Sequence, residues 1–248
     1  MPEDLDAALS AAVRAVLPGS AEVARGHLWH GRPDHWRPDG RGRWSSPVAL
    51  RVAAAAGMPV APLATRLAAS LGAGLTERLG VAAGRAIEVG EGGFLVVTPG
   101  PDDCVAAVAA VLAGGPAYGR PTRPVSPMVV DPTVPQRRTP DNPRFVVMWA
   151  HARCCVVLDG VTTDGTAATA TPTPIERVLV LLLADLPRAI TAAGDDPAGV
   201  LRRLLEVAAA THGWLDELPA TDRRAPGTRD LAEAARQVLA PGLDVLGL

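Results

Sequence analysis

The chain has 248 residues, of which 48% are hydrophobic and 20% are charged, values typical of a globular protein. Its 24 basic and 26 acidic residues leave a net charge of −2, which excludes a strongly basic nucleic-acid binder or an acidic tail as the main theme. Every basic residue is an arginine, so chemistry that requires lysine, such as a Schiff base or a Walker phosphate loop, is excluded within this chain.

Cysteine use and apolar runs indicate the compartment. Cys104, Cys154 and Cys155 form no disulfide framework and no C-x-x-C metal motif, so we expect small buried side chains in a reducing environment. The N-terminus has no apolar signal segment, and the longest apolar run, residues 178–184, is too short to span a bilayer. These features predict a cytoplasmic protein without membrane contact.

The first 115 residues are predicted to form a small α+β domain. Leu5, Leu9, Val13 and Leu17 recur every four residues and indicate a helix over residues 4–17. Further elements expected in this domain are helices at 47–56, at 60–71 with Gly72 past its end, and from Asp102 to Gly114, and strands at 87–89 and 94–97 around a glycine-rich hairpin turn.

Residues 25–47 are rich in proline, glycine and arginine and are predicted to be a loop. His27, His30 and His35 suggest zinc, but no complete set of four ligands is evident, so we expect no metal. The tryptophans of this stretch either stack on RNA bases or anchor the loop to its domain, and we favour anchoring. These tryptophans are Trp29, Trp36 and Trp44.

Seven prolines make residues 116–141 an extended linker. The remainder, 142–248, is predicted to be an all-α helical bundle. Asn142 and Pro143 provide an N-cap and a proline at the first helical position. The four helices are expected at 142–158, 174–193, 196–218 and from 228 or 230 to 239, with a disordered stretch at 159–173.

Two motifs in this second half resemble those of a known family. Residues 142–153, N-P-R-F-V-V-M-W-A-H-A-R, resemble the N-P-x-x-Y-V-Q-Y-A-H-A-R helix of arginyl-tRNA synthetases. Residues 235–247 resemble the closing A-T-R-Q-V-L-x-N-G-L-x-L-L-G of the same family, and residues 175–189 its second helix. The resemblance implies that residues 142–248 are a DALR-type anticodon-binding domain.

The first half resembles the N-terminal additional domain of the same family. Val48-Ala49-Leu50 is similar to its N-V-A-L-Q-L-A helix, residues 93–97 to its G-F-I-N-F strand, and Tyr118-Gly119 to its closing Y-G. The implied organisation is an α+β domain over 1–115, a linker over 116–141 and an anticodon-binding helical bundle over 142–248.

The catalytic domain of the family has no counterpart here. Residues 116–141 are too few for a Rossmann domain, the H-I-G-H motif is absent, and the K-M-S-K-S loop needs lysine. That lysine neutralises phosphate charge in the transition state. We therefore expect no catalytic residue, no cofactor and no aminoacylation by this chain alone.

The resemblance implies tRNA contacts in the last helices. Arginines would bind phosphates and Trp214 would stack on a base; the candidates are Arg202, Arg203, Trp214, Arg236 and Gln237. Alternatively, the arginines form solvated helix faces with ion pairs such as Arg202–Glu206 and Arg229–Glu233.

Departures from the family imply weakened specificity. Positions 203, 211 and 215 lack the aromatic residues of the family, and Val96 replaces an asparagine that reads the D-loop. Each lost stacking contact would forfeit about 1–3 kcal/mol.

The helix at 142–158 has two interpretations. Trp149, His151 and Arg153 could face a protein partner that replaces the catalytic domain. Alternatively, Phe145, Trp149, Ala152 and Val156 form its core stripe and His151 is a structural histidine, which is the interpretation we favour.

Two hypotheses follow. The first is a tRNA-binding paralogue of arginyl-tRNA synthetase without ligase activity, with arginine tRNA as a candidate ligand and no DNA. The second is a protein-interaction or regulatory module that kept the accessory fold. A hydrolase that uses the histidine cluster is a remote third.

Overall fold

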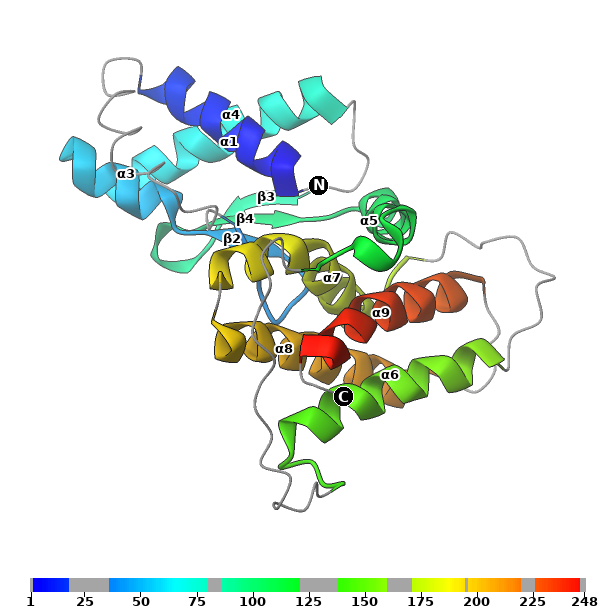
Figure 1. Cartoon of the computed structure of the whole chain (residues 1–248). Coiled ribbons are helices and arrows are strands. Elements are labelled where there is room, and N and C mark those ends of the chain that lie inside the picture. Colours follow the sequence, from blue (N-terminus) through cyan, green and yellow to red (C-terminus); the bar gives the residue numbers. More distant parts are fainter. Residues whose placement is uncertain are drawn as a thin grey trace. The chain divides into compact units, whose positions relative to one another are not determined.

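The computed structural model describes residues 2–17, 36–79, 86–120, 138–159, 171–194, 196–219 and 226–245. The chain divides into two compact units, Met1–Asp103 and Cys104–Leu248. The first contains a small antiparallel sheet with helices and the second is helical in its described part (Figure 1), which confirms the predicted fold class.

The sheet of the first unit has the strand order β1-β2-β4-β3, all antiparallel. Its strands are β1 (Arg37–Pro38), β2 (Trp44–Ser46), β3 (Ala86–Val89) and β4 (Leu95–Thr98). The prediction that 25–47 is only a loop is therefore wrong for β1 and β2. The sequence Asp39-Gly40 is a turn signal that could have predicted the hairpin between β1 and β2. In the structure the Asp39 carboxylate accepts bonds from the backbone N–H groups of Arg41 and Arg43, each at 2.9 Å. Strands of two and three residues are too short to show alternation.

The tryptophans of this stretch are core residues. Trp36 and Trp44 are completely buried, which confirms that they anchor the segment and contradicts stacking on RNA. The structure does not describe Trp29 or the three histidines of this stretch, so the expectation that no metal binds there stays a prediction. These histidines are His27, His30 and His35.

Three helices lie on one side of the sheet: α1 (Pro2–Val16), α3 (Val48–Ala56) and α4 (Val60–Leu79) (Figure 1). The predicted stripe of α1 is buried from Leu5 to Leu17. The prediction that the third helix ends before Gly72 is wrong, because Leu71 and Leu75 continue its buried stripe. Burying them outweighs the cost of about 1 kcal/mol for a glycine inside a helix.

The hairpin between β3 and β4 contains the short helix η1 (Glu91–Gly93). Gly93 has φ 85°, and a Cβ there would lie 2.4 Å from Cγ1 of Val60. Only glycine fits this position, because the backbone has a positive φ and a side chain here would collide with Val60 of α4. The predicted glycine-rich turn is confirmed.

Helix α5 (Pro101–Ala113) begins in the first unit and continues into the second. Its residues Cys104, Ala107 and Val111 are part of the core of the second unit. The predicted domain limits at 115 and 141 stay a prediction, and residues 121–137 lie outside the described part.

The second unit contains η2 (Gly115–Ala117), α6 (Pro143–Asp159), α7 (Pro174–Ala193), α8 (Pro197–Glu217) and α9 (Pro226–Val245). Helix α8 contacts α6, α7 and α9, and α6 packs most extensively on α9. Asn142 caps α6 as predicted, since its Oδ1 accepts a bond from the Arg144 N–H at 3.1 Å. Helix α9 runs past the predicted end at 239, through Pro241 and Gly242, where a Cβ would lie 2.7 Å from two Leu204 methyl carbons.

Candidate functional site

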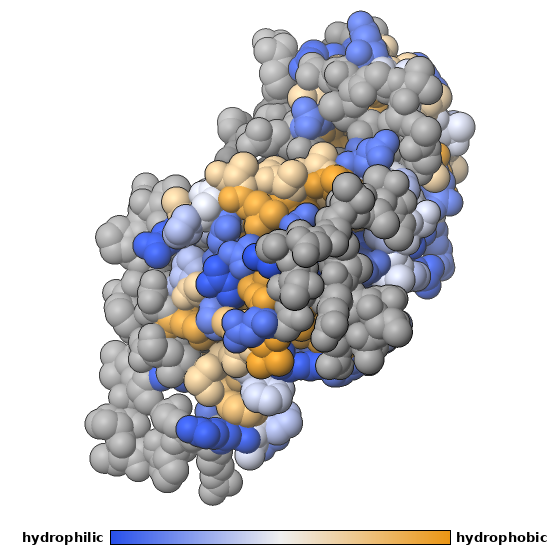
Figure 2. Space-filling model, turned by 90° about the vertical axis from the view of Figure 1, so that its right-hand side faces the viewer, coloured by the Kyte–Doolittle hydropathy of each residue, from blue (hydrophilic) through white to orange (hydrophobic). Residues whose placement is uncertain are grey.

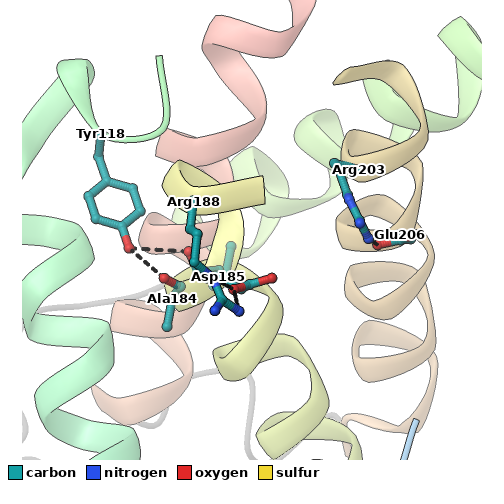
Figure 3. A network of polar contacts seen from close by, with 7 residues as sticks. Tyr118, Ala184, Asp185, Arg188, Arg203 and Glu206 are labelled. Carbon is teal, nitrogen blue, oxygen red and sulfur yellow. Dashed lines mark hydrogen bonds and ion pairs between the residues drawn. The ribbon is translucent and has the colours of Figure 1, made fainter. Parts of the chain in front are cut away.

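The residues predicted on α8 have different surroundings. Arg202 is exposed. Glu206 forms its ion pair with Arg203, at 2.8 Å (Figure 3), and not with Arg202 as the alternative interpretation expected. Trp214 is 1% exposed and lies in the core of the bundle. The prediction that Trp214 stacks on a base is therefore wrong, because no base can reach its ring.

On α9, Arg236 pairs with Glu233 and not with an outside group. The guanidinium hydrogen bond holds the pKa of Glu233 below its usual value, although partial burial opposes this, and the same contact raises the pKa of Arg236. Exposed pairs of this kind contribute at most about 1 kcal/mol, so a phosphate could replace the carboxylate at small cost.

Gln237 has a structural role. Its amide nitrogen donates to the carbonyls of Val111 at 2.6 Å and of Gly115 at 2.7 Å. Val111 lies in the last turn of α5, where carbonyls lack partners within the helix. Gln237 thus ties α9 to the end of α5, and the prediction that its amide contacts RNA is wrong for this N–H₂ group.

Tyr118 supplies a hydrogen-bond donor where α7 lacks one. Pro187 has no N–H, so the carbonyl of Leu183, four residues earlier, lacks its usual helical donor. The Tyr118 hydroxyl donates to this carbonyl at 3.2 Å. It also lies 3.5 Å from the carbonyl oxygen of Ala184 (Figure 3). Burial, with the neighbouring charge of Asp185 as the second cause, raises the pKa of Tyr118 to about 12 and keeps the hydroxyl protonated. Asp185 pairs with Arg188 beside it.

Arg153 joins α6 to α8. Its guanidinium lies 3.1 Å from Nδ1 of His212 and donates to Oδ1 of Asp216 at 2.7 Å. Nε2 of His212 lies 3.1 Å from the carbonyl oxygen of Val146. This arrangement fits a neutral imidazole that donates from Nε2 and accepts at Nδ1. Burial is the main cause that lowers the pKa of His212, and Arg153 adds to it. Arg153 therefore faces its own bundle, contrary to the prediction of a partner contact.

His151 lies toward α9 and is half-buried. Its Nδ1 is 3.9 Å from Sγ of Cys155, and burial followed by the charge of Arg236 lowers its pKa. Cys104 and Cys154 are buried as predicted, and burial raises the pKa of the Cys154 thiol to about 12. Cys155 is only half-buried, contrary to the prediction.

The outer face of α6 carries apolar side chains. Its buried residues are Arg144, Val147, Ala150 and Cys154. The predicted core stripe lies on the opposite side of the helix, where Trp149 is 50% and Val156 72% exposed. The Phe145 and Trp149 rings stack at 6.0 Å between centroids. The core interpretation of this stripe is wrong, because the face with Val147, Ala150 and Cys154 is the one that packs on α8 and α9. We call Phe145, Trp149, Ala152 and Val156 the outer stripe.

Residues 147–248 match the family described as the DALR anticodon binding domain. The matched segment covers the four helices α6 to α9 almost completely. Over these residues the chain is similar to DALR anticodon binding domains, and we refer to residues 147–248 as the DALR domain.

Relatives of the chain include arginine–tRNA ligases of several bacteria. That of Clavibacter sepedonicus is 34% identical over 133 residues, which cover 48% of this chain and 24% of the ligase. Those of Renibacterium salmoninarum and Acidovorax ebreus are 33% and 40% identical, over 50% and 44% of this chain and 25% and 21% of the ligases. The chain thus matches about a quarter of the length of these relatives. No solved structure matches it significantly.

Three positions at which the family has residues expected to contact RNA are buried in this chain. Thr211 and Leu215 of the DALR domain are 0% and 4% exposed, and Val96 in β4 is 4% exposed. In this chain these three side chains contribute to packing, and the expectation that their residue types weaken tRNA specificity stays a prediction. Arg203 is the one aligned position of α8 that reaches the surface.

Hydrophilic and apolar residues are interspersed on the face drawn in Figure 2, where hydrophobic patches lie beside hydrophilic ones among the residues that are coloured. Within the described ranges, no three His, Cys, Asp or Glu residues gather as metal ligands, and no helix is long and apolar enough to cross a membrane.

Proposed function

We propose that the chain binds tRNA through its DALR domain, with arginine tRNA as the first candidate. The observation that supports this is the family match over residues 147–248, on helices that occur in the order the resemblance implies. The relationship to arginine–tRNA ligases in sequence supports the same choice of ligand.

The contacts we propose are phosphate contacts by Arg202, Arg203 and Arg236. Arg202 is exposed, and the other two form shallow ion pairs within their own helices that leave 30% and 37% of the side chain accessible. Because i,i+3 pairs on a surface are weak, phosphate oxygens can compete with the carboxylates. Each such contact releases counterions from the RNA, so binding should weaken with salt.

Aminoacylation is not part of this proposal. The chain contains no lysine and no H-I-G-H motif, and its matches to the ligases leave about three quarters of their length uncovered. We infer that these residues recognise or hold tRNA and do not activate an amino acid.

The test is a binding titration of the full chain with arginine tRNA and with total tRNA at two salt concentrations. We compare R202Q/R203Q with R14Q/R51Q, which removes two exposed helix arginines from the first unit. The α8 variant should weaken binding and reduce the slope of log K against log salt by about 0.7–0.9 for each lost contact. Absence of salt-sensitive binding, or equal effects of the two variants, would contradict the proposal.

The second candidate, a protein-interaction module, is favoured by one observation. The outer stripe of α6 exposes large apolar side chains on a helix that is otherwise packed into the bundle. Exposed apolar surface on a folded domain is typical of an interaction site.

A further inference from the structure

The outer stripe has the spacing of a helix–helix contact seam. Residues 145, 149, 152 and 156 follow intervals of four, three and four, which is the a/d pattern of two heptads. Met148, 37% exposed, lies beside the seam. The only Arg, Lys, Asp or Glu residue between Phe145 and Val156 is Arg153, and its guanidinium is turned toward α8. Figure 1 shows α6 at the edge of the bundle. Trp149 and Val156 of the seam are 50% and 72% exposed.

The seam is complementary to itself in one orientation. A twofold axis between residues 150 and 151 places Phe145 opposite Val156 of an antiparallel second copy, and Trp149 opposite its Ala152. Each large side chain then meets a small one, as close packing of two helices requires. In a parallel pair the two Trp149 rings would meet each other and the two Ala152 methyls would leave a gap.

Charge favours the same orientation. Asp159 is the last residue of α6 and is exposed, so it lies at the negative end of its own helix dipole. In the antiparallel pair it would lie beside the first turn of the opposite α6, where the positive end of the helix dipole favours an acidic side chain. A residue that is unfavourable in the single copy becomes favourable in the pair.

We propose that the outer stripe of α6 binds a second copy of this chain, antiparallel, to form a symmetric dimer. Such an interface is isologous, so one patch serves both copies. A 17-residue helix is about 25 Å long and its seam is smaller than the about 1,600 Å² of a standard interface, so the dimer should dissociate on dilution. The proposal does not depend on tRNA binding.

Sedimentation equilibrium of the full chain, from about 1 to 300 μM, tests this association. The mass of the wild type should rise with concentration toward twice 25.5 kDa. V156D places a charge in the seam and should weaken association at least tenfold. V105D is the matched control, because Val105 is also an exposed helical valine, 58% accessible on α5, and it should associate like the wild type.

The orientation is tested by exchanging the two central residues. W149A should weaken association, and W149A/A152W should restore it, because an antiparallel pair then again sets a large ring against a methyl group. A wild type that stays monomeric throughout, or a dimer that V156D leaves intact, would overturn the proposal. Failure of the exchange to restore association would overturn the antiparallel register. The tRNA titration of V156D separates the two proposals, since its RNA affinity should match the wild type.

Discussion

Trp149 and Trp214 lie in the same helical bundle but have opposite surroundings. Trp214 is enclosed by the core at 1% exposure, whereas Trp149 is half exposed on the outer stripe of α6. Helix α6 has apolar residues on both sides, with Val147, Ala150 and Cys154 inward and Phe145 and Trp149 outward. The difference teaches that an apolar pattern alone does not decide which face of α6 enters the core, because both faces carry such a pattern and only one packs on α9.

The largest expected effect comes from replacing each tryptophan by alanine. W214A leaves a cavity in the core and should lower the free energy of unfolding by about 3–5 kcal/mol. W149A removes a half-exposed ring and its stacking on Phe145, and should cost about 1 kcal/mol or less. Urea denaturation of both variants at low protein concentration measures the contrast. Equal losses would show that the two rings do not differ in burial.

A smaller effect is expected where polar groups compensate the proline of α7. Y118F leaves the buried carbonyl of Leu183 without the hydroxyl donor and should cost about 1–2 kcal/mol. In a P187A background the new N–H can bond to that carbonyl, so the same Y118F change should cost less. A double-mutant cycle by denaturation measures the coupling, and strictly additive effects would contradict the compensation.

The smallest effect is a pH dependence from His212. Its pKa is lowered in the folded chain, so between about pH 6.5 and the folded value the unfolded chain binds more protons. The stabilisation that comes from the uncharged His212 is therefore fully present above about pH 6.5 and is lost as the pH falls below it. Melting temperatures at pH 7.5 and 5.5 should differ less in H212Q than in the wild type. His151 shifts in the same direction, so H151Q is the comparison that separates the two histidines. An unchanged pH difference in H212Q would contradict the lowered pKa of His212.

Periodicity and caps predicted most helices, because such signals are local. Asn142 and Asp196 stand at the predicted starts of α6 and α8, and each side chain accepts a bond from a backbone N–H of the first turn. Thr173 caps α7 in the same way, although it is predicted to end a disordered stretch. Helix ends at Gly72 and Leu239 were predicted too early, since contacts from distant residues continue α4 and α9 past a glycine or proline. Short β2 could not be recognised without its partner β4.

Prediction of the candidate site was less successful for a related reason. A family motif names positions, but it does not say whether a side chain is already bound within the fold. Gln237 and Arg153 bond to carbonyl and carboxylate groups more than 60 residues away in sequence, and such contacts leave no local pattern. Arg202 and Arg203 remain accessible because their side of α8 faces outward.

Helix α5 also determines where the DALR domain can be cut from the chain. The family match begins at residue 147, yet Cys104, Ala107 and Val111 lie in the same core and Gln237 is bonded to the end of α5. A fragment that starts at residue 142 would expose the apolar surface that α5 covers and leave the Gln237 amide without its two acceptors. The smallest autonomous piece of this domain is therefore expected to begin at α5, about forty-five residues before the family match does.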